Sequence, residues 1–219
     1  MSKSTLLKNI VTENREISPG VYLLSFEKKF DFTPGQIVAL SLDPGDREPR
    51  LYSICSGTKE NIISILFNIV PSGKITGQLA GLRPGEAVHT SRPYGRFTVG
   101  PESSFWVASG TGIAPFVSML RSEQIRSSYL IHGGRDSLSF YFSSEFQTAL
   151  GSKYIKCSST LKEPGYFEGR VSAYLRNSTS LPMDYRYYLC GRAEMVVEAR
   201  DILISKGIPY NMIEAEIYF

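Results

Sequence analysis

The stretch SFWVASGTGIAPFVSMLRSEQ, residues 104–124, decides the fold class of this chain. Its first part is an apolar run that ends in glycine, which predicts a buried strand at 104–110. Residues 113–124 then show the helical spacing of apolar side chains. Pro115 stands near the start of this predicted helix, where a proline is tolerated. The stretch therefore predicts a strand, a glycine turn and a helix, which is the repeating unit of an α/β sheet.

The same alternation of strand and helix continues to the end of the chain. Serines are expected to cap the next predicted helix, at residues 143–150. Strands that alternate with helices form βαβ units and a mostly parallel, doubly wound sheet. The further predicted strands are 128–134, 154–159, 185–191 and 212–219, and the further predicted helices are 143–150, 170–177 and 194–207. Residues 101–219 are therefore predicted to form an α/β domain.

Upstream of this stretch, the sequence consists of short β-type runs. Val, Ile, Leu, Phe and Tyr recur in segments that Gly, Pro and Asp turns separate. The predicted strands are 21–26, 37–42, 50–56, 62–70 and 87–99, with one short predicted helix at 74–82. Residues 1–100 are therefore predicted to form an antiparallel β-barrel. The chain is expected to hold two domains, this barrel followed by the doubly wound parallel sheet.

The composition argues against several classes of function. The net charge of +3 is too small to indicate a nucleic-acid partner. The cysteines are far apart and form no C-x-x-C pair, which argues against a zinc site, an iron–sulfur cluster and a disulfide framework. No apolar run is long enough to cross a membrane, and the amino-terminal segment lacks a signal-peptide pattern. We expect a cytoplasmic protein that binds no metal, nucleic acid or membrane.

Three loops of the predicted α/β domain follow strands, which is where open sheets bind ligands. SGTGIAP (109–115) has small residues that let a ligand approach the backbone, and the helix after it offers N–H groups to an anion. HGGR (132–135) and CGR (190–192) each place Gly and Arg after a strand, and Arg binds phosphate through paired hydrogen bonds. Each loop alone also fits an ordinary turn with a solvated Arg.

Two segments of the predicted barrel also fit either a plain structural role or a ligand site. RLYSICSG carries a charge, a ring and a hydroxyl at Arg50, Tyr52 and Ser53, which fits a solvated sheet face or a flat anionic ligand. SGKITG (72–77) fits a helix cap or a pyrophosphate site that uses backbone N–H groups and the Thr76 hydroxyl. No serine-hydrolase or zinc-protease motif occurs. The chain lacks a catalytic set of its own, which indicates chemistry carried by cofactors.

Six motifs in one order resemble the ferredoxin/flavodoxin–NADP reductase family, in its compact bacterial type. They are RLYSICS, GKIT, SGTGIAPF, HGGR, LCG and the terminal EIYF. The resemblance implies FAD in the barrel and NADP(H), with NAD(H) as an alternative, in the α/β domain. It also implies that Arg50 holds the FAD pyrophosphate, that Tyr52 stacks on the isoalloxazine and that Ser53 hydrogen-bonds near flavin N5. The implied FAD-binding residues are Arg50, Leu51, Tyr52, Ser53, Gly73, Lys74, Ile75, Thr76, Tyr218 and Phe219.

The resemblance assigns the nucleotide site and the catalytic residues as well. Cys190 is expected beside the nicotinamide. Tyr218 is expected to cover the flavin face where the nicotinamide enters, so Tyr218 has to move first. The implied catalytic residues are Ser53, Cys190, Glu216 and Tyr218. The implied NADP-binding residues are Gly110, Thr111, Gly112, Pro115, Arg135, Lys162, Arg170, Cys190 and Gly191.

The sequence departs from the family pattern at two places. RPYG at 92–95 stands where the family often has G-P-x-G. Ser-Thr at 159–160 stands where bacterial relatives often have Ser-Arg to bind the 2′-phosphate of NADP. By resemblance, Arg135, Lys162 and Arg170 are expected to hold this phosphate instead.

The resemblance implies ferredoxin or flavodoxin as the partner, and no appended iron–sulfur domain is expected. Such partners are acidic, so Lys28, Lys29 and Arg47 are expected on a basic rim of a monomer. Two alternatives stay open. One is an NAD(P)H-dependent flavin reductase or the reductase component of an oxygenase. The other is a non-catalytic subunit that binds flavin or nucleotide.

Overall fold

The computed structural model describes residues 6–73, 75–125 and 127–218 of the chain. Its contacts divide the chain into two compact units. Unit 1 is Met1–Thr98 together with Ala114–Ser122, and unit 2 is Val99–Ile113 together with Glu123–Phe219. Each unit contains one six-stranded sheet.

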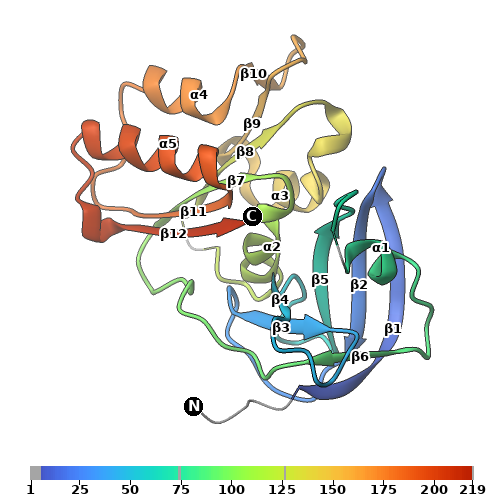
Figure 1. Cartoon of the computed structure of the whole chain (residues 1–219). Helices are drawn as coiled ribbons and strands as arrows, with labels where there is room; N and C mark the ends of the chain where they lie inside the picture. Colours follow the sequence, from blue (N-terminus) through green and yellow to red (C-terminus); the bar gives the residue numbers. More distant parts are fainter. Residues whose placement is uncertain (1–5, 74, 126, 219) are drawn as a thin grey trace. The chain divides into compact units, whose positions relative to one another are not determined.

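Unit 1 is an antiparallel β-barrel (Figure 1). The strand order is β4-β3-β6-β1-β2-β5, and all neighbouring strands are antiparallel. A bridge between Ile54 and Ile65 joins the end of β4 to β5, which closes the sheet on itself. The strands are β1 (Leu7–Ser18), β2 (Val21–Glu27), β3 (Ile37–Ser41), β4 (Arg50–Ser53), β5 (Ile62–Asn68) and β6 (Ala87–Thr90).

The barrel encloses an aliphatic and aromatic core, and two helices pack on it. Val38, Leu40 and Ile65 are fully buried in this core. Helix α1 (Thr76–Ala80) lies between β5 and β6 in sequence and buries Leu79 in the same core. Helix α2 (Ala114–Arg121) is grouped with unit 1, and its Ser118 hydroxyl donates to the Ser56 carbonyl at 2.7 Å.

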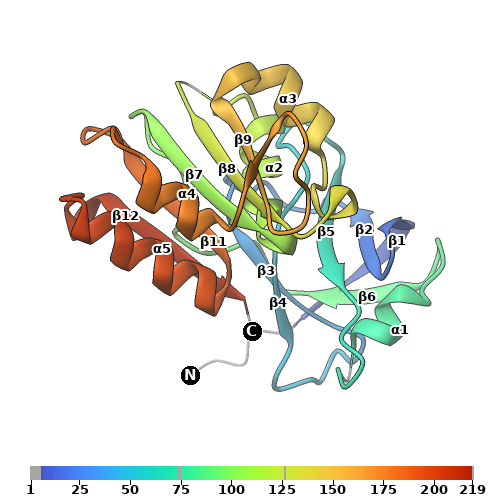
Figure 2. The same cartoon turned by 90° about the horizontal axis from the view of Figure 1, so that it is seen from above.

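Unit 2 is a doubly wound parallel sheet with the strand order β10-β9-β8-β7-β11-β12. Figure 2 shows α4 and α5 on one side of the strands and α3 on the other. The side chains alternate accordingly, so Val107 packs with α4 and α5 while Trp106, its neighbour on β7, faces away from that cluster. The elements are β7 (Ser104–Ser109), β8 (Tyr129–Gly134), β9 (Tyr154–Ser158), β10 (Tyr166–Glu168), β11 (Arg186–Arg192), β12 (Ile213–Tyr218), α3 (Ser143–Leu150), α4 (Val171–Asn177) and α5 (Ala193–Ser205).

These two sheets confirm the predicted fold class, but four local predictions need correction. Strands β1 and β10 were not predicted. The predicted strand at 87–99 is wrong beyond Thr90, where β6 ends. Pro93 has no N–H to donate, Gly95 has φ of +115°, and only Tyr94 in this segment forms a bridge, with Ile37.

The fourth correction concerns the start of α3. The predicted serine caps are not present, because the serines are the first residues inside the helix. The capping position is Phe142, whose φ of +57° is left-handed and which provides no side-chain cap hydrogen bond. The expected site residues Lys74 and Phe219 lie outside the described residues.

Candidate functional site

Strand β4 presents the residues that were expected to hold FAD. Tyr52 packs edge-on against Phe67, with ring centroids 6.2 Å apart, and burial raises the pKa of its hydroxyl to about 12 despite the opposing charge of Arg50. Ser53 is only 3% exposed, whereas Leu51 is 58% exposed. Arg50 is exposed, and no described carboxylate forms an ion pair with it. The strand therefore combines a free cation, a protonated phenol and a buried hydroxyl, which fits a flat anionic ligand.

The segment before α1 is a tight turn. The Gly73 N–H donates to the Val70 carbonyl at 2.8 Å, and the Val70 N–H donates to the Thr76 hydroxyl at 3.0 Å. A Cβ on Gly73 would lie 3.0 Å from the Val70 carbonyl oxygen and 3.1 Å from the Thr76 Oγ1, so glycine fits best. Ile75 caps the helix without a side-chain hydrogen bond. The Thr76 hydroxyl thus already accepts one bond inside the turn and keeps its own proton for a further acceptor.

In unit 2, all strands are parallel, so their carboxyl ends lie along one edge of the sheet. Strand β7 ends at Ser109, and the 3₁₀ turn η1 (Gly110–Ile113) follows with φ of +55° at Gly110. A Cβ on Gly112 would collide with the Cys190 carbonyl oxygen at the end of β11. The glycines of this loop therefore let the turn approach β11 as closely as two backbones can.

The Ser109 side chain is a polar group without a partner in this edge. Its Oγ is buried and makes no hydrogen bond within the described residues. A Cβ on Gly191, whose φ is +148°, would lie 2.5 Å from this Oγ, so Gly191 leaves the space that the hydroxyl occupies. A buried hydroxyl without a partner is costly, and it fits a site where a ligand completes the hydrogen bonding. The residues present therefore fit a dinucleotide at this edge.

Three of the expected catalytic residues lie together at the ends of β11 and β12. Cys190 is fully buried and pairs in register with Glu216, while Arg192 pairs with Tyr218. Burial, and then the Glu216 carboxylate, raise the pKa of the Cys190 thiol well above its usual value, and a side-chain hydrogen bond with Tyr218 opposes this rise. The thiol is therefore neutral at pH 7 and can act as a hydrogen-bond donor. Ser53, the fourth expected residue, belongs to unit 1.

The expected 2′-phosphate residues lie past the ends of β8, β9 and β10. Arg135 is exposed, and its carbonyl accepts hydrogen bonds from Ser158 at 2.7 Å and from Thr160. Arg170 is exposed at the residue before α4. Lys162 already has an anionic partner.

The partner of Lys162 is the Glu168 carboxylate, at 2.7 Å. The hydrogen bond and the charge of Glu168 raise the pKa of Lys162, although both side chains are largely exposed. This pair forms because the unpredicted strand β10 places Glu168 beside Ser158 at the end of β9. Lys162 is thus not the free cation that was expected from the sequence.

Among the nucleotide-site residues, Pro115 is buried as the second residue of α2, and Gly110 and Thr111 are half-exposed. Reasoning from the sequence left Ser109 out of the expected site, although it lies in the SGTGIAP loop. The signal for it was a small polar residue at the end of an apolar strand.

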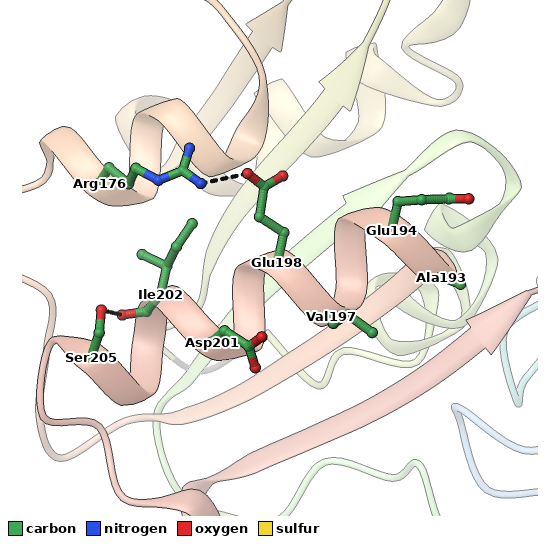
Figure 3. A pocket seen from close by; sticks show the side chains of 8 residues that line it. All are labelled: Arg176, Ala193, Glu194, Val197, Glu198, Asp201, Ile202 and Ser205. Carbon is green, nitrogen blue, oxygen red and sulfur yellow. Dashed lines mark hydrogen bonds and ion pairs between the residues drawn. The ribbon is translucent and has the colours of Figure 1, made fainter.

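A surface groove lies elsewhere, away from the expected site residues. It has a volume of about 680 Å³ and runs along α4 and α5, and it contains the ion pair between Arg176 and Glu198 at 2.5 Å (Figure 3). The lining residues are Arg176, Ala193, Glu194, Val197, Glu198, Asp201, Ile202 and Ser205. Only Ala193 and Glu194, at the start of α5, lie near the carboxyl edge of the sheet, and none of the expected site residues lines this groove.

The described part of the chain lacks two further kinds of feature, a metal cluster and a membrane-spanning helix. No group of three or more His, Cys, Asp or Glu side chains there could hold a metal ion. Within the same residues, every helix is too short or too polar to cross a bilayer.

Comparison with known proteins assigns both units. Residues 8–99 match the oxidoreductase FAD-binding domain family, and residues 106–201 match the oxidoreductase NAD-binding domain family. Ferredoxin–NADP reductase B of Sorangium cellulosum is 30% identical, over 93% of this chain and 94% of that protein. The 2-halobenzoate 1,2-dioxygenase electron transfer component of Burkholderia cepacia is 29% identical over 84% of this chain, which spans 58% of that relative.

A solved structure shows the same fold. The ferredoxin NADP⁺ reductase of Neisseria gonorrhoeae, crystallised with FAD and NADP, aligns with a TM-score of 0.86 over 99% of this chain and 100% of that chain, at 18% identity. Both domain types, their order and the similarity to the Sorangium protein agree. The chain belongs to the ferredoxin–NADP reductase family and is a flavoprotein oxidoreductase with an FAD-binding and an NAD(P)-binding domain.

Proposed function

We propose that this chain moves a hydride from NADPH to N5 of FAD and then passes single electrons to a ferredoxin or a flavodoxin. When bound, FAD supplies this chemistry, because a flavin accepts a hydride and releases its electrons one at a time. The observation that carries the proposal is the cluster of Cys190, Glu216 and Tyr218 at the ends of β11 and β12. It provides a neutral donor, a carboxylate and an aromatic ring at one place.

Each residue has a role that follows from its chemistry. The neutral Cys190 thiol donates toward the nicotinamide, and the Glu216 carboxylate beside it accepts from the carboxamide. Tyr218 yields the space that the nicotinamide needs. In unit 1, the Ser53 hydroxyl hydrogen-bonds at flavin N5, and Tyr52, protonated at every physiological pH, stacks on the ring.

The preference for NADPH rests on Arg135 and Arg170, the two expected cations that form no ion pair among the described residues. Lys162 adds little, since Glu168 neutralises it. NADH is therefore a plausible second donor.

Ferredoxin or flavodoxin is proposed as the acceptor because the similarity covers 94% of a protein named ferredoxin–NADP reductase. The basic rim is weaker than expected from the sequence. Lys28 lies 3.4 Å from Asp31, and Lys29 lies 3.9 Å from Glu27. Arg47 remains exposed without such a partner in the described residues. We propose that the protein is a monomer in a reducing compartment, as the three free, buried cysteines favour.

A second candidate is the reductase component of an oxygenase. The observation that favours it is the 29% identity to the 2-halobenzoate dioxygenase component. In that case the acceptor would be an oxygenase or its ferredoxin.

An anaerobic titration of the flavin's visible band with NADPH and with NADH tests the proposal. Rapid bleaching followed by reduction of a ferredoxin or flavodoxin supports it. Turnover of free flavin without any preference for these proteins favours a flavin reductase. A yellow protein that neither nucleotide bleaches would be a non-catalytic flavin-binding subunit, and the proposal would be wrong.

Two buried cysteines of the same sheet give a matched pair of variants. Cys190→Ala should slow bleaching by at least about tenfold, since alignment of the nicotinamide is lost. Cys157→Ala, in the core under α4, should change the rate by less than about twofold. FAD content measured for both variants separates a slower reaction from a loss of cofactor.

A further inference from the structure

The arginines of unit 2 that the structure describes divide into two groups. Three of them form ion pairs. Arg176 pairs with Glu198, and Arg200 pairs with Asp201. Arg186 pairs with both Glu102 and Glu214. Arg135, Arg170 and Arg192 form no ion pair among the described residues, although the charge of Arg170 helps to lower the pKa of Glu198, and all three are exposed near the carboxyl ends of strands. In the sequence, CGR fits either a phosphate-binding loop or an ordinary turn with a solvated Arg, and the family resemblance gives Arg192 no role.

The position of Arg192 relative to the η1 turn is fixed by close backbone contacts. Arg192 is the last residue of β11, directly after the two residues against which the turn packs. Gly112 lies against the Cys190 carbonyl, and Gly191 lies against the Ser109 hydroxyl. In the strand order, β11 is on one side of β7, whereas β8 and β10, which precede Arg135 and Arg170, are on the other. The end of β7 therefore has exposed arginines on both sides.

Local structure gives no reason for an arginine at this position. Arg192 is the N-cap of the 13-residue helix α5, and it forms no side-chain cap hydrogen bond. Serine, threonine, aspartate or asparagine caps a helix better, and a cation is unfavourable at the positive end of the helix dipole. A position that breaks both local rules is expected where a ligand compensates for the cost.

The charge of Arg192 also affects Tyr141, which follows a strand on the other side of β7. Burial and Asp136 raise the pKa of Tyr141, and Arg192 opposes this rise. Tyr141 follows the 3₁₀ turn η2 (Ser137–Ser139), which comes after β8. Arg192 therefore acts on a residue that follows β8, a strand on the other side of β7 from β11.

We propose that Arg192 binds the pyrophosphate that NADPH and NADH share. Arg135 and Arg170 act on the 2′-phosphate, which only NADPH carries, so Arg192 sets affinity for both nucleotides without setting the preference between them. The inference rests on the proposed nucleotide chemistry. Arg192 is a binding and positioning residue, and it has no part in hydride transfer itself.

Calorimetric binding of three ligands to the flavin-loaded protein tests this. Arg192→Gln should weaken NADP⁺ and NAD⁺ alike, by about tenfold, as expected for the loss of a charge-assisted hydrogen bond, and should leave 2′-AMP unchanged. Arg135→Gln should weaken NADP⁺ and 2′-AMP and leave NAD⁺ unchanged. Arg200→Gln, on the same helix and ion-paired to its neighbour Asp201, is the matched control and should change none of the three.

Two more variants separate binding from folding. Arg192→Lys should recover part of the affinity, because a point charge remains but the paired hydrogen bonds are lost. Arg192→Ser should melt at the same or a higher temperature than the wild type, because serine improves the cap of α5, and still bind both dinucleotides more weakly.

Each remaining outcome overturns the inference in a distinguishable way. Equal affinities for wild type and Arg192→Gln would show that Arg192 is only a solvated cap, with the proposed function intact. Weaker 2′-AMP binding by Arg192→Gln would place this side chain at the 2′-phosphate instead. A wild-type protein that binds neither dinucleotide would overturn the proposed function as well.

Discussion

Replacing Gly191 by alanine should destabilise unit 2 more than the same change at Gly151, a glycine of this unit with open space around it. Gly191 has φ of +148°, a region that other residues avoid. A Cβ would lie 2.5 Å from the Ser109 Oγ, 2.9 Å from the Met195 Cε and 3.0 Å from the Ser109 carbonyl oxygen. Met195 can swing aside, but the Ser109 carbonyl belongs to the β7 backbone and cannot.

The expected cost has two parts. The backbone conformation costs about 1–3 kcal/mol for a residue with a side chain. Forcing a methyl group into packed surroundings costs about 1–3 kcal/mol more. Gly151→Ala is the matched control, because Gly151 has φ of +55° in the same unit and nothing lies within 4 Å of its Cβ position. That variant carries a backbone cost alone, about 1–3 kcal/mol, because φ of +55° with ψ of −122° is also a conformation that residues with side chains avoid.

Urea unfolding followed by tryptophan fluorescence measures the difference. Trp106 is the only tryptophan of the chain, and it is fully buried in β7, so its emission reports on unit 2. Gly191→Ala should unfold at a clearly lower urea concentration than Gly151→Ala. In a double-mutant cycle, Ser109→Ala should recover about 1 kcal/mol of the loss, because it removes the nearest atom. Equal midpoints for the two glycine variants, or a cycle without coupling, would refute the steric reasoning.

Three further predictions concern the cofactor, the nucleotide and pH. Tyr52→Ala should lose FAD on gel filtration while Tyr52→Phe retains it, as the ratio of visible to ultraviolet absorbance will show; unchanged FAD content in the alanine variant would contradict the stacking role. Glu168→Gln should free Lys162 and strengthen NADP⁺ binding a few-fold with NAD⁺ unchanged, and calorimetry that shows equal gains for both would contradict this. Burial lowers the pKa of the His132 imidazole to about 3, so between pH 6.5 and pH 3 only the unfolded chain binds a proton at this residue. The free energy of unfolding should therefore fall by up to about 1.4 kcal/mol per pH unit over this range. His132→Gln should reduce this slope, as acid unfolding curves of the two proteins will show.

The buried elements of this fold were predictable because burial requires apolar residues at most of their positions. Strand β7 was expected at 104–110 and occurs at Ser104–Ser109, since both faces of a parallel strand are covered and it reads as an unbroken apolar run. The η1 turn was marked by glycines that the close approach to β11 requires. The prediction that Cys190 and Glu216 lie on strands is also confirmed.

The elements that sequence reasoning missed are those where burial is weak. Strand β1 spans 12 residues, but only Asn9 and Val11 are buried, so charges interrupt its pattern. Strand β10 has three residues and none is buried. Its absence from the prediction hid the pair of Lys162 with Glu168, because no local rule places residues six apart in contact across a loop and a short strand.

The alignment of Cys190 with Glu216 depends on the register between β11 and β12, which sequence spacing alone does not determine. A slip by one residue would turn Ile213 and Ile217 away from the core that they pack against, so burial excludes it. A slip by two residues would keep every face correct and shift β12 by about 6.6 Å. A slip in one direction would place Glu214 beside Cys190 and take that carboxylate away from Arg186, whereas a slip in the other would place Tyr218 beside Cys190 and leave the thiol without a carboxylate.

Arg186 opposes this second slip from the far end of the strand. Its Nε donates to Glu102 at 2.6 Å, and its Nη1 donates to Glu214 at 3.2 Å, so one side chain ties β12 to the segment before β7. A two-residue shift would carry Glu214 beyond the reach of the guanidinium. The ion pairs at the amino ends of the strands and the proposed catalytic pair at the carboxyl ends therefore require the same register, so Arg186, which contacts neither Cys190 nor Glu216, helps to align them.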